Sequence, residues 1–262
     1  MWLILAVTIA GAAEVDVIAH RGFSGVAPEN TMSAFEAAAN ISVGFELDVT
    51  LAATGEVIVL HDDTVDRTTD GSGAAAELSL DELRALDAGS WFSPDFAGER
   101  IPTLAEVLDT YGGDVPIDIE IKSTTPREPL ADAVVEVIEA ANLVDQVFVT
   151  SFDPYILERV KEQNPDIRRG QLTGTFKDAD LNFIEKLVLR RMWLNGKSEP
   201  GIVAVEDARI KRPRRVKRWH RKGYLVYVWT VNDEAEMRRL VDYGVDGIIT
   251  DHPDVLQRLI GE

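Results

Sequence analysis

The chain has 262 residues, of which 45% are hydrophobic, and this length suits one large α/β domain better than two small domains. It contains no cysteine, which excludes disulfide bonds, thiolate metal sites and a cysteine nucleophile. Its formal net charge of −18 argues against nucleic acid as a partner, because a polyanion would meet long-range repulsion.

Residues 1–13 form an apolar leader. The leader is too short for a transmembrane helix, which needs roughly 20 apolar residues. It resembles the apolar core of a signal peptide that ends in small residues, although the usual preceding positive charge is missing. We therefore expect an exported protein, periplasmic or extracellular. The alternative is a cytoplasmic protein in which this segment caps a barrel.

From residue 15 onward, short apolar runs alternate with longer segments of helical period. The predicted strands are Val15–Ala19, Val43–Val49, Pro116–Ile121, Gln146–Thr150, Ile167–Leu172, Gly201–Val205, Leu225–Trp229 and Gly247–Thr250. The predicted helices are Thr31–Asn40, Thr103–Tyr111, Pro129–Ala141, Pro154–Gln163, Asp178–Trp193, Arg209–Lys222, Glu234–Tyr243 and Pro253–Ile260. Eight strands, each followed by a helix, predict an α/β fold: a TIM (β/α)8 barrel that fills residues 14–262 as a single domain.

The long connection between the second and third strands, at about residues 50–115, interrupts this alternation. It opens with a hairpin pattern, "LAATGEVIVLHDD", in which Thr54 and Gly55 form the turn. Glycine-rich and helical pieces follow, and their apolar content is small. We interpret the connection as a small insertion after the second strand rather than as a second domain.

Two strands carry acidic residues at every second position. "GFELDVT" places Glu46 and Asp48 on one face, and "PIDIEIK" places Asp118, Glu120 and Lys122 on one face. If the apolar residues between them face the covering helices, the charges face the barrel interior, where unpaired carboxylates are costly. A hard divalent metal held by carboxylate oxygens would offset this cost. A static network of ion pairs with neighbouring basic residues is the alternative.

The chain contains four histidines. His20 ends the first strand and His61 ends the hairpin strand, so both are expected at the C-terminal mouth of the barrel, where active sites of this fold lie. Two imidazoles beside carboxylates suit a general acid and base, because imidazole titrates near neutral pH. His220 is expected on the protein surface and His252 at the start of the last helix.

Two basic residues are expected at the same mouth. Arg21 follows His20 directly, and Lys122 ends the second acidic strand. Both would supply positive charge to an oxyanion, and arginine offers a bidentate fork. Together with a metal and two histidines, they favour phosphoryl transfer as the chemistry.

The segments "AHRGFSGVAPENTMSAFEAA", "GFELDVTLAATGEVIVLHDDTVDRTTDGSG", "DIEIK", "VYVWTVND" and "GVDGIITDHP" resemble the glycerophosphodiester phosphodiesterase family. The matching segments are spread over nearly the whole chain. The resemblance implies a TIM barrel with a small insertion after the second strand. It also implies metal-dependent hydrolysis of a glycerophosphodiester substrate to glycerol 3-phosphate and an alcohol, with one divalent ion, Mg²⁺ or Ca²⁺, as the cofactor.

The resemblance further implies roles for individual residues. His20 and His61 look like the acid–base pair, without a decision on which is the acid. Glu46, Asp48 and Glu120 look like the metal ligands.

Three more positions match the substrate-binding residues of the family. Arg21 and Lys122 look like phosphate contacts. Trp229 is similar to a tryptophan that lines the pocket, and from the sequence alone a core residue at a strand end is an equal interpretation.

The segment 181–222 combines apolar residues with a dense basic run, in which eight of the twelve residues from Lys211 to Lys222 are Lys or Arg. A solvated helix face in an acidic protein is one interpretation. Peripheral contact with an anionic membrane is the other. Membrane contact would favour an alternative function, a phosphodiesterase of the lysophospholipase D or phospholipase C type. An alternative of another class is a catalytically silent barrel that binds metal or phosphate.

Overall fold

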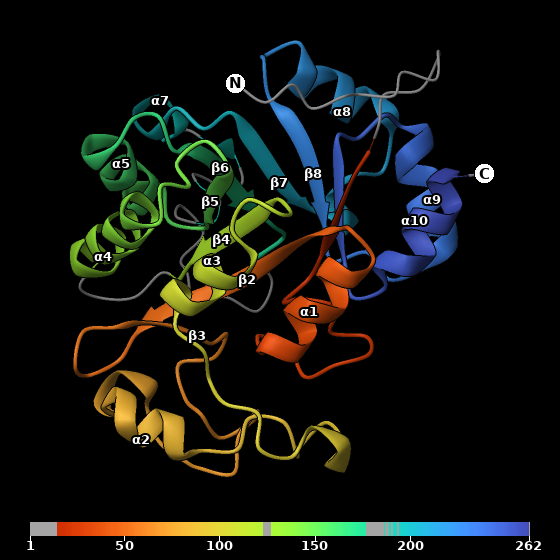
Figure 1. Ribbon diagram of the computed structural model, residues 1–262. Coiled ribbons are helices and arrows are strands. Elements are labelled where there is room, and N and C mark those ends of the chain that lie inside the picture. Colours follow the sequence, from red (N-terminus) through yellow and green to blue (C-terminus); the bar gives the residue numbers. More distant parts are fainter. Residues whose placement is uncertain are drawn as a thin grey trace.

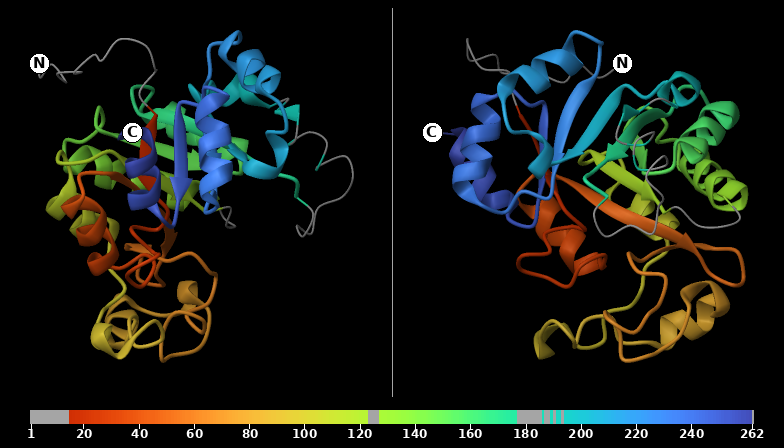
Figure 2. Two further views of the ribbon diagram at one scale, coloured as in Figure 1. Left: turned by 90° about the vertical axis from the view of Figure 1, so that its right-hand side faces the viewer. Right: turned by 180° about the vertical axis from the view of Figure 1, so that it is seen from behind.

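The computed structural model describes residues 15–122, 127–176 and 194–261, together with residues 186, 189, 191 and 192. Within these residues, parallel strands form a closed barrel with helices around it (Figures 1 and 2). The barrel strands are β1 (Asp16–Ala19), β2 (Gly44–Leu51), β4 (Ile117–Ile121), β5 (Val147–Ser151), β6 (Arg168–Thr173), β7 (Ile202–Glu206), β8 (Leu225–Trp229) and β9 (Gly247–Thr250). They pair in the order β1-β9-β8-β7-β6-β5-β4-β2, and pairing of β1 with β2 closes the ring. The fold is the predicted TIM barrel.

The covering helices begin at capping residues that the sequence supplies. Thr103 forms a capping box with Glu106 at the start of α3, and Asp153 caps α5, whose first residue is Pro154. The described helices are α1 (Met32–Asn40), α2 (Leu80–Ala85), α3 (Leu104–Tyr111), α4 (Arg127–Ala140), α5 (Pro154–Gln163), α7 (Asn195–Ser198), α8 (Pro213–His220), α9 (Glu234–Asp242) and α10 (Pro253–Gly261).

Strand β4 shows how alternation separates the apolar layer from the site. Ile117, Ile119 and Ile121 are fully buried in the apolar layer that packs against helices α3 and α4. The residues between them face the opposite way, and β2 pairs with β4 so that Asp48 lies beside Glu120. The apolar residues therefore fix the strands, and the acids are left in the barrel interior, as expected.

The interior beneath these acids is filled by apolar and aromatic side chains. They come from strands around the ring: Ile18, Phe148, Leu172, Ile202, Ala204, Tyr227 and Ile249. The rings of Phe148 and Tyr227 pack edge to face with centroids 5.7 Å apart. The Tyr227 hydroxyl is satisfied by hydrogen bonding to Asp16. The barrel is thus a packed core with its charges at the C-terminal mouth.

The insertion after the second strand is present. Strand β3 (Val57–Val59) pairs antiparallel with β2, and Gly55 in the predicted turn has a φ of +99°. The segment that follows carries α2 and forms its own small apolar cluster, which includes Ile58 and Leu83. In Figures 1 and 2 this part projects from one end of the barrel.

The predicted strands are all present, with bounds shifted by a residue or two. The predicted basic helix is shorter than expected, because Pro213 starts α8 after a separate 3₁₀ turn, Asp207–Arg209. The leader at residues 1–13 and most of the predicted helix at 178–193 lie outside the described residues.

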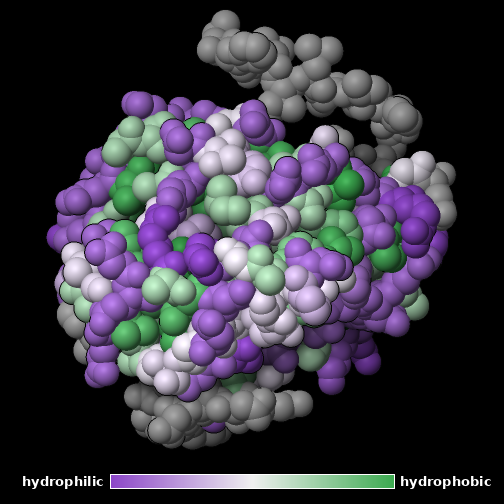
Figure 3. Space-filling view, turned by 60° about the horizontal axis from the view of Figure 1, so that its bottom comes forward, coloured by the Kyte–Doolittle hydropathy of each residue, from purple (hydrophilic) through white to green (hydrophobic). Residues whose placement is uncertain are grey.

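The eight cations between Lys211 and Lys222 are all exposed. A solvated helix face and peripheral membrane contact would both leave these cations exposed. Exposure therefore does not distinguish the two interpretations, and membrane contact through 181–222 stays a prediction. Among the described residues, no helix combines the length and apolar character needed to cross a membrane. The face in Figure 3 carries small apolar patches among hydrophilic residues.

The core of β4 offers a test of this architecture. We expect Ile119→Ala to lower the free energy of unfolding by about 2–5 kcal/mol, because the side chain is fully buried and its loss leaves a cavity. Urea denaturation followed by circular dichroism measures this change. The control is Glu136→Ala at an exposed position of α4, with an expected effect within about 0.5 kcal/mol. Equal stability of the two variants would contradict the proposed packing.

Candidate active site

The structure gathers the predicted site residues at one pocket in the mouth of the barrel. The predicted residues that line it are His20, Arg21, Glu46, His61, Glu120, Lys122 and Trp229. Asp48 lies against this group, with its side chain only 1% exposed. The two other histidines lie elsewhere, because exposed His220 is hydrogen-bonded to Asp246 and His252 directly precedes α10.

A sharp turn directly after β1 brings His20 and Arg21 into the pocket. Arg21 has a φ of +56° and Gly22 a φ of +77°, so the chain reverses immediately after His20. The backbone N–H of Arg21 donates to Glu46 Oε2 at 2.9 Å and that of Gly22 to the Glu46 carbonyl at 3.1 Å. A Cβ at position 22 would lie 2.7 Å from backbone and side-chain atoms of Ala34. Only glycine fits at position 22 of this turn.

Three carboxylates converge from the adjacent strands β2 and β4. Glu46, Asp48 and Glu120 each offer an oxygen, and these oxygens lie within 4.8 Å of one another. Lys122 Nζ is 2.8 Å from Asp48 Oδ1 and 3.2 Å from Glu120 Oε1. Arg21 Nε is 3.3 Å from Asp48 Oδ2. The carboxylates therefore lie close enough to bind one cation together.

The positive charge in this cluster is unevenly shared. Burial raises the pKa of Asp48, but Lys122 and Arg21 more than offset it and hold that pKa below its ordinary value. Burial and the neighbouring carboxylates of Asp48 and Glu120 hold the pKa of Glu46 well above its ordinary value. A divalent cation would relieve this repulsion, and all-oxygen ligands suit Mg²⁺ or Ca²⁺.

Asp118 also lines the pocket and lies two residues before Glu120 on β4. Thr150 Oγ1 donates to its Oδ1 at 2.8 Å, whereas its buried Oδ2 has no hydrogen-bond partner among the described residues. Burial raises the pKa of this carboxyl well above its ordinary value. An orphaned carboxylate oxygen beside the three acids is further reason to expect a cation there.

An aspartate directly after the last strand, β9, holds His20. His20 Nδ1 is 2.6 Å from Asp251 Oδ1, and Ser24 and Asn232 donate to the same carboxylate. Burial raises the pKa of Asp251, but the hydrogen bonds and the charge of His20 lower it to about 2. Because the ionised carboxylate can only accept, His20 donates through Nδ1 and keeps Nε2 for a ligand.

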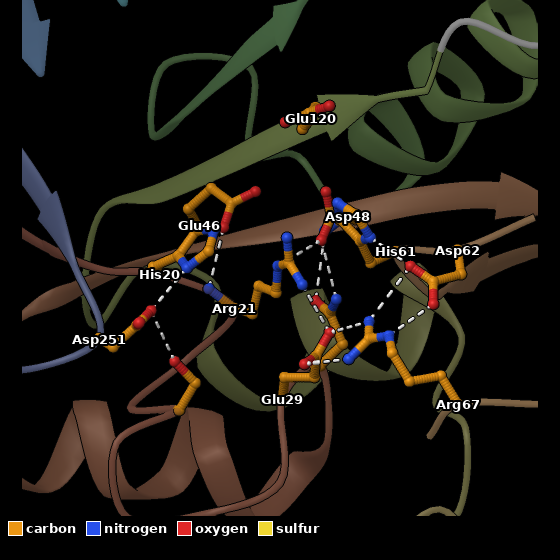
Figure 4. A network of polar contacts seen from close by, with 12 residues as sticks. His20, Arg21, Glu29, Glu46, Asp48, His61, Asp62, Arg67, Glu120 and Asp251 are labelled. Carbon is orange, nitrogen blue, oxygen red and sulfur yellow. Dashed lines mark hydrogen bonds and ion pairs between the residues drawn. The ribbon is translucent and has the colours of Figure 1, made fainter. Parts of the chain in front are cut away.

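A second aspartate holds His61 in the same way. Its Nδ1 is 2.6 Å from Asp62 Oδ1 (Figure 4). Hydrogen bonds from Arg67 are the main reason why the pKa of Asp62 is lowered to about 2. Arg67 also donates to Glu29, which accepts from Arg21 Nη1 at 2.7 Å.

Sequence reasoning did not identify Asp62, Asp251, Glu29 or Arg67, nor Asn30, which donates to Asp48 Oδ2 at 2.9 Å. Asp62 adjoins His61, and this adjacency was a usable signal. Asp251 is 231 residues from His20, so only barrel closure brings the two together.

Aromatic residues form one wall of the pocket. Trp229 packs edge to face with Phe152 at a centroid distance of 5.5 Å. Its buried Nε1 has no hydrogen-bond partner among the described residues. Trp229 lines the pocket and also packs against the apolar cluster of the barrel interior, so its position fits both interpretations.

Asp251→Asn tests the charge beside His20. The pKa of about 2 lies below the ordinary 3.8, so ionised Asp251 stabilises the folded state above about pH 4, and this contribution is lost as the pH falls through about 2. We expect the variant's free energy of unfolding to fall less than that of the wild type between about pH 4 and pH 2. Chemical denaturation across this window measures it, with Asp254→Asn at an exposed carboxylate as the control. Parallel curves for Asp251→Asn and the wild type would contradict the assignment.

Comparison with known proteins places this site in a family. Residues 20–255 match the family model described as the glycerophosphoryl diester phosphodiesterase family. A glycerophosphodiester phosphodiesterase of Caldanaerobacter subterraneus is 38% identical over 250 residues, covering 93% of this chain and 97% of that protein. A Bacillus subtilis protein of the same name is 31% identical, with coverage of 92% and 85%.

Solved structures agree with the sequence relatives. An Oleispira antarctica phosphodiesterase, solved in complex with the product sn-glycerol-3-phosphate, is 31% identical with a TM-score of 0.82, covering 94% of this chain and 97% of that one. A glycerophosphodiester phosphodiesterase from Agrobacterium tumefaciens is 27% identical with a TM-score of 0.77, covering 94% of this chain and 100% of that one. The chain belongs to the glycerophosphoryl diester phosphodiesterase family.

Proposed function

We propose that the protein hydrolyses glycerophosphodiesters to glycerol 3-phosphate and an alcohol, with one divalent metal ion and with His20 and His61 as the acid–base pair. The observation that carries the proposal is the convergence of two aspartate-held imidazoles and three carboxylates on one pocket. The product bound in the Oleispira antarctica relative supports the substrate class.

The metal would be held by Glu46, Asp48 and Glu120, whose mutual repulsion fits a cation. When bound, a divalent ion would supply Lewis-acid stabilisation of negative charge on the phosphate. Mg²⁺ and Ca²⁺ both prefer oxygen ligands, so the ligand set does not distinguish them.

The protein's own side chains would carry out the proton transfers and bind the phosphate. One imidazole would accept a proton from the nucleophile through Nε2, and the other, protonated on both nitrogens, would donate one to the departing alkoxide. Arg21 and Lys122 bring positive charge to the same pocket and would bind phosphate oxygens. The ring of Trp229 gives the carbon atoms of the substrate an apolar surface.

The alternatives from the sequence are less well supported. A phosphodiesterase of the lysophospholipase D or phospholipase C type and a silent binding barrel both lack a relative among the proteins compared above. Product analysis separates them, because a lysophospholipase D would release lysophosphatidate, a phospholipase C would release diacylglycerol and a silent barrel would release nothing.

His20→Ala and His61→Ala test the acid–base pair. We expect each to lower the rate of glycerol 3-phosphate release from glycerophosphocholine and glycerophosphoethanolamine by about 10²–10⁴-fold, the contribution typical of a placed proton transfer. His220→Ala is the matched control, because this exposed imidazole pairs with Asp246 outside the pocket. Wild-type rates in either pocket variant would contradict the proposed pair.

Chelation and Glu46→Gln test the metal. We expect EDTA to abolish release and Mg²⁺ or Ca²⁺ to restore it, because the cluster needs a cation to act. Isothermal titration calorimetry should show weaker binding of the activating ion by Glu46→Gln and unchanged binding by the control Glu136→Gln, an exposed carboxylate on α4. Full activity in EDTA, or unaltered metal affinity of Glu46→Gln, would rule out the site.

A further inference from the structure

Arg67 joins two parts of the active site without lining the pocket. Its Nε and Nη2 donate to the carboxylate of Asp62 at 2.6 and 3.2 Å. Its Nη1 and Nη2 donate to the carboxylate of Glu29 at 2.8 and 2.7 Å. One guanidinium thus holds two carboxylates that come from different segments of the chain, one before and one after β2.

Each of these carboxylates holds a residue of the pocket. Asp62 accepts from Nδ1 of His61 at 2.6 Å, and Glu29 accepts from Nη1 of Arg21 at 2.7 Å. The result is a continuous series of hydrogen bonds from His61 through Asp62, Arg67 and Glu29 to Arg21, which is visible in Figure 4. Arg67 is the central link.

Arg67 is the most exposed of these five residues. The side chain of Arg67 is 45% exposed, that of Asp62 28% and that of Glu29 13%. Because Arg67 does not line the pocket, it can act on the pocket residues only through Asp62 and Glu29. The planar fork of arginine can bind both carboxylates at once, whereas the single ammonium of lysine cannot reproduce that geometry.

We propose that Arg67 is a positioning residue. It fixes Asp62, and Asp62 in turn fixes the orientation and the Nδ1–H form of His61. It also fixes Glu29, and Glu29 in turn fixes the side chain of Arg21. This rests on the proposed function for the catalytic role of His61 and the phosphate contact of Arg21. The insertion then supplies a catalytic histidine together with the residue that ties it to the barrel.

His20 provides an internal comparison in the same molecule. Its aspartate, Asp251, is held by Ser24 and Asn232, and none of the hydrogen bonds described for these residues involves Arg67. Loss of Arg67 should therefore affect His61 and leave His20 unchanged. A general disturbance of the fold would affect both imidazoles.

Arg67→Met, studied without metal or substrate, tests the effect on His61 directly. The ¹⁵N shifts of histidine-labelled protein report which ring nitrogen carries the proton, and the signals are assigned with His20→Ala and His61→Ala. We expect the Nδ1–H form of His61 to decline in Arg67→Met and that of His20 to remain. Arg67→Lys should show a partial change.

Steady-state kinetics with glycerophosphocholine supplies the second measurement. We expect Arg67→Met to lower kcat by about 10–10²-fold, less than the about 10²–10⁴-fold expected for loss of the histidine itself. We expect KM to rise as well, because Arg21 loses its support. Arg84→Met is the matched control, since Arg84 lies in the same insertion and pairs with Glu106 away from the pocket.

A double-mutant cycle adds an independent check. If Arg67 acts on His61 through Asp62, Arg67→Met combined with Asp62→Asn should lower kcat little more than Asp62→Asn alone. Unchanged His61 shifts in Arg67→Met, equal changes in His20 and His61, or additive losses of kcat in the cycle would each overturn the proposal. An inactive wild type would contradict the proposed function instead, and the ¹⁵N shifts would still decide whether Arg67 positions His61.

Discussion

Three carboxylates on two adjacent strands, two of them buried and one half-buried, are the constraint on which the rest of the site depends. The pairing of β2 with β4 places Asp48 beside Glu120, and such charges are costly in a protein interior without compensation. Lys122 and Arg21 compensate Asp48, whereas Glu46 keeps a raised pKa. The half-buried Lys122, directly after β4, and the backbone N–H of Arg21 in the turn before Gly22 both bring positive charge to these carboxylates.

The sequence predicted the parts of the molecule whose signals are periodic. Alternation of isoleucines with charges in β4 revealed both the barrel strand and the direction in which its acids point. His20 and His61 were found because each ends an apolar run. His20 ends a parallel barrel strand, which places it at the mouth, and His61 follows the antiparallel strand β3, which runs back beside β2 to the level of Asp48. The same two-residue period placed Glu46 and Asp48 on one face and Asp118, Glu120 and Lys122 on another, and the resemblance to the family then singled out Glu46, Asp48 and Glu120 as metal ligands.

Apart from Asp62, which adjoins His61, the supporting residues of the site carry no such signal. Asp251 meets His20 only when β9 pairs with β1, which depends on closure of the whole ring. Arg67 lies in an irregular part of the insertion, and its two partners come from separate segments. Asn30 precedes a helix, where asparagine is typical of a cap, yet Thr31 caps α1 and the Asn30 side chain turns to Asp48. Tertiary contact decided each of these roles, and local pattern could not.

The packed lower half of the barrel also determines where ligands enter and leave the pocket. Phe148, Tyr227 and their neighbours fill the interior below the acids, so ligands reach the pocket from the C-terminal mouth. Under the proposed function, both products of one turnover leave through the opening by which the next substrate enters. A retained product therefore occupies the entrance itself, and the order in which glycerol 3-phosphate and the alcohol depart sets when the enzyme is free to begin again.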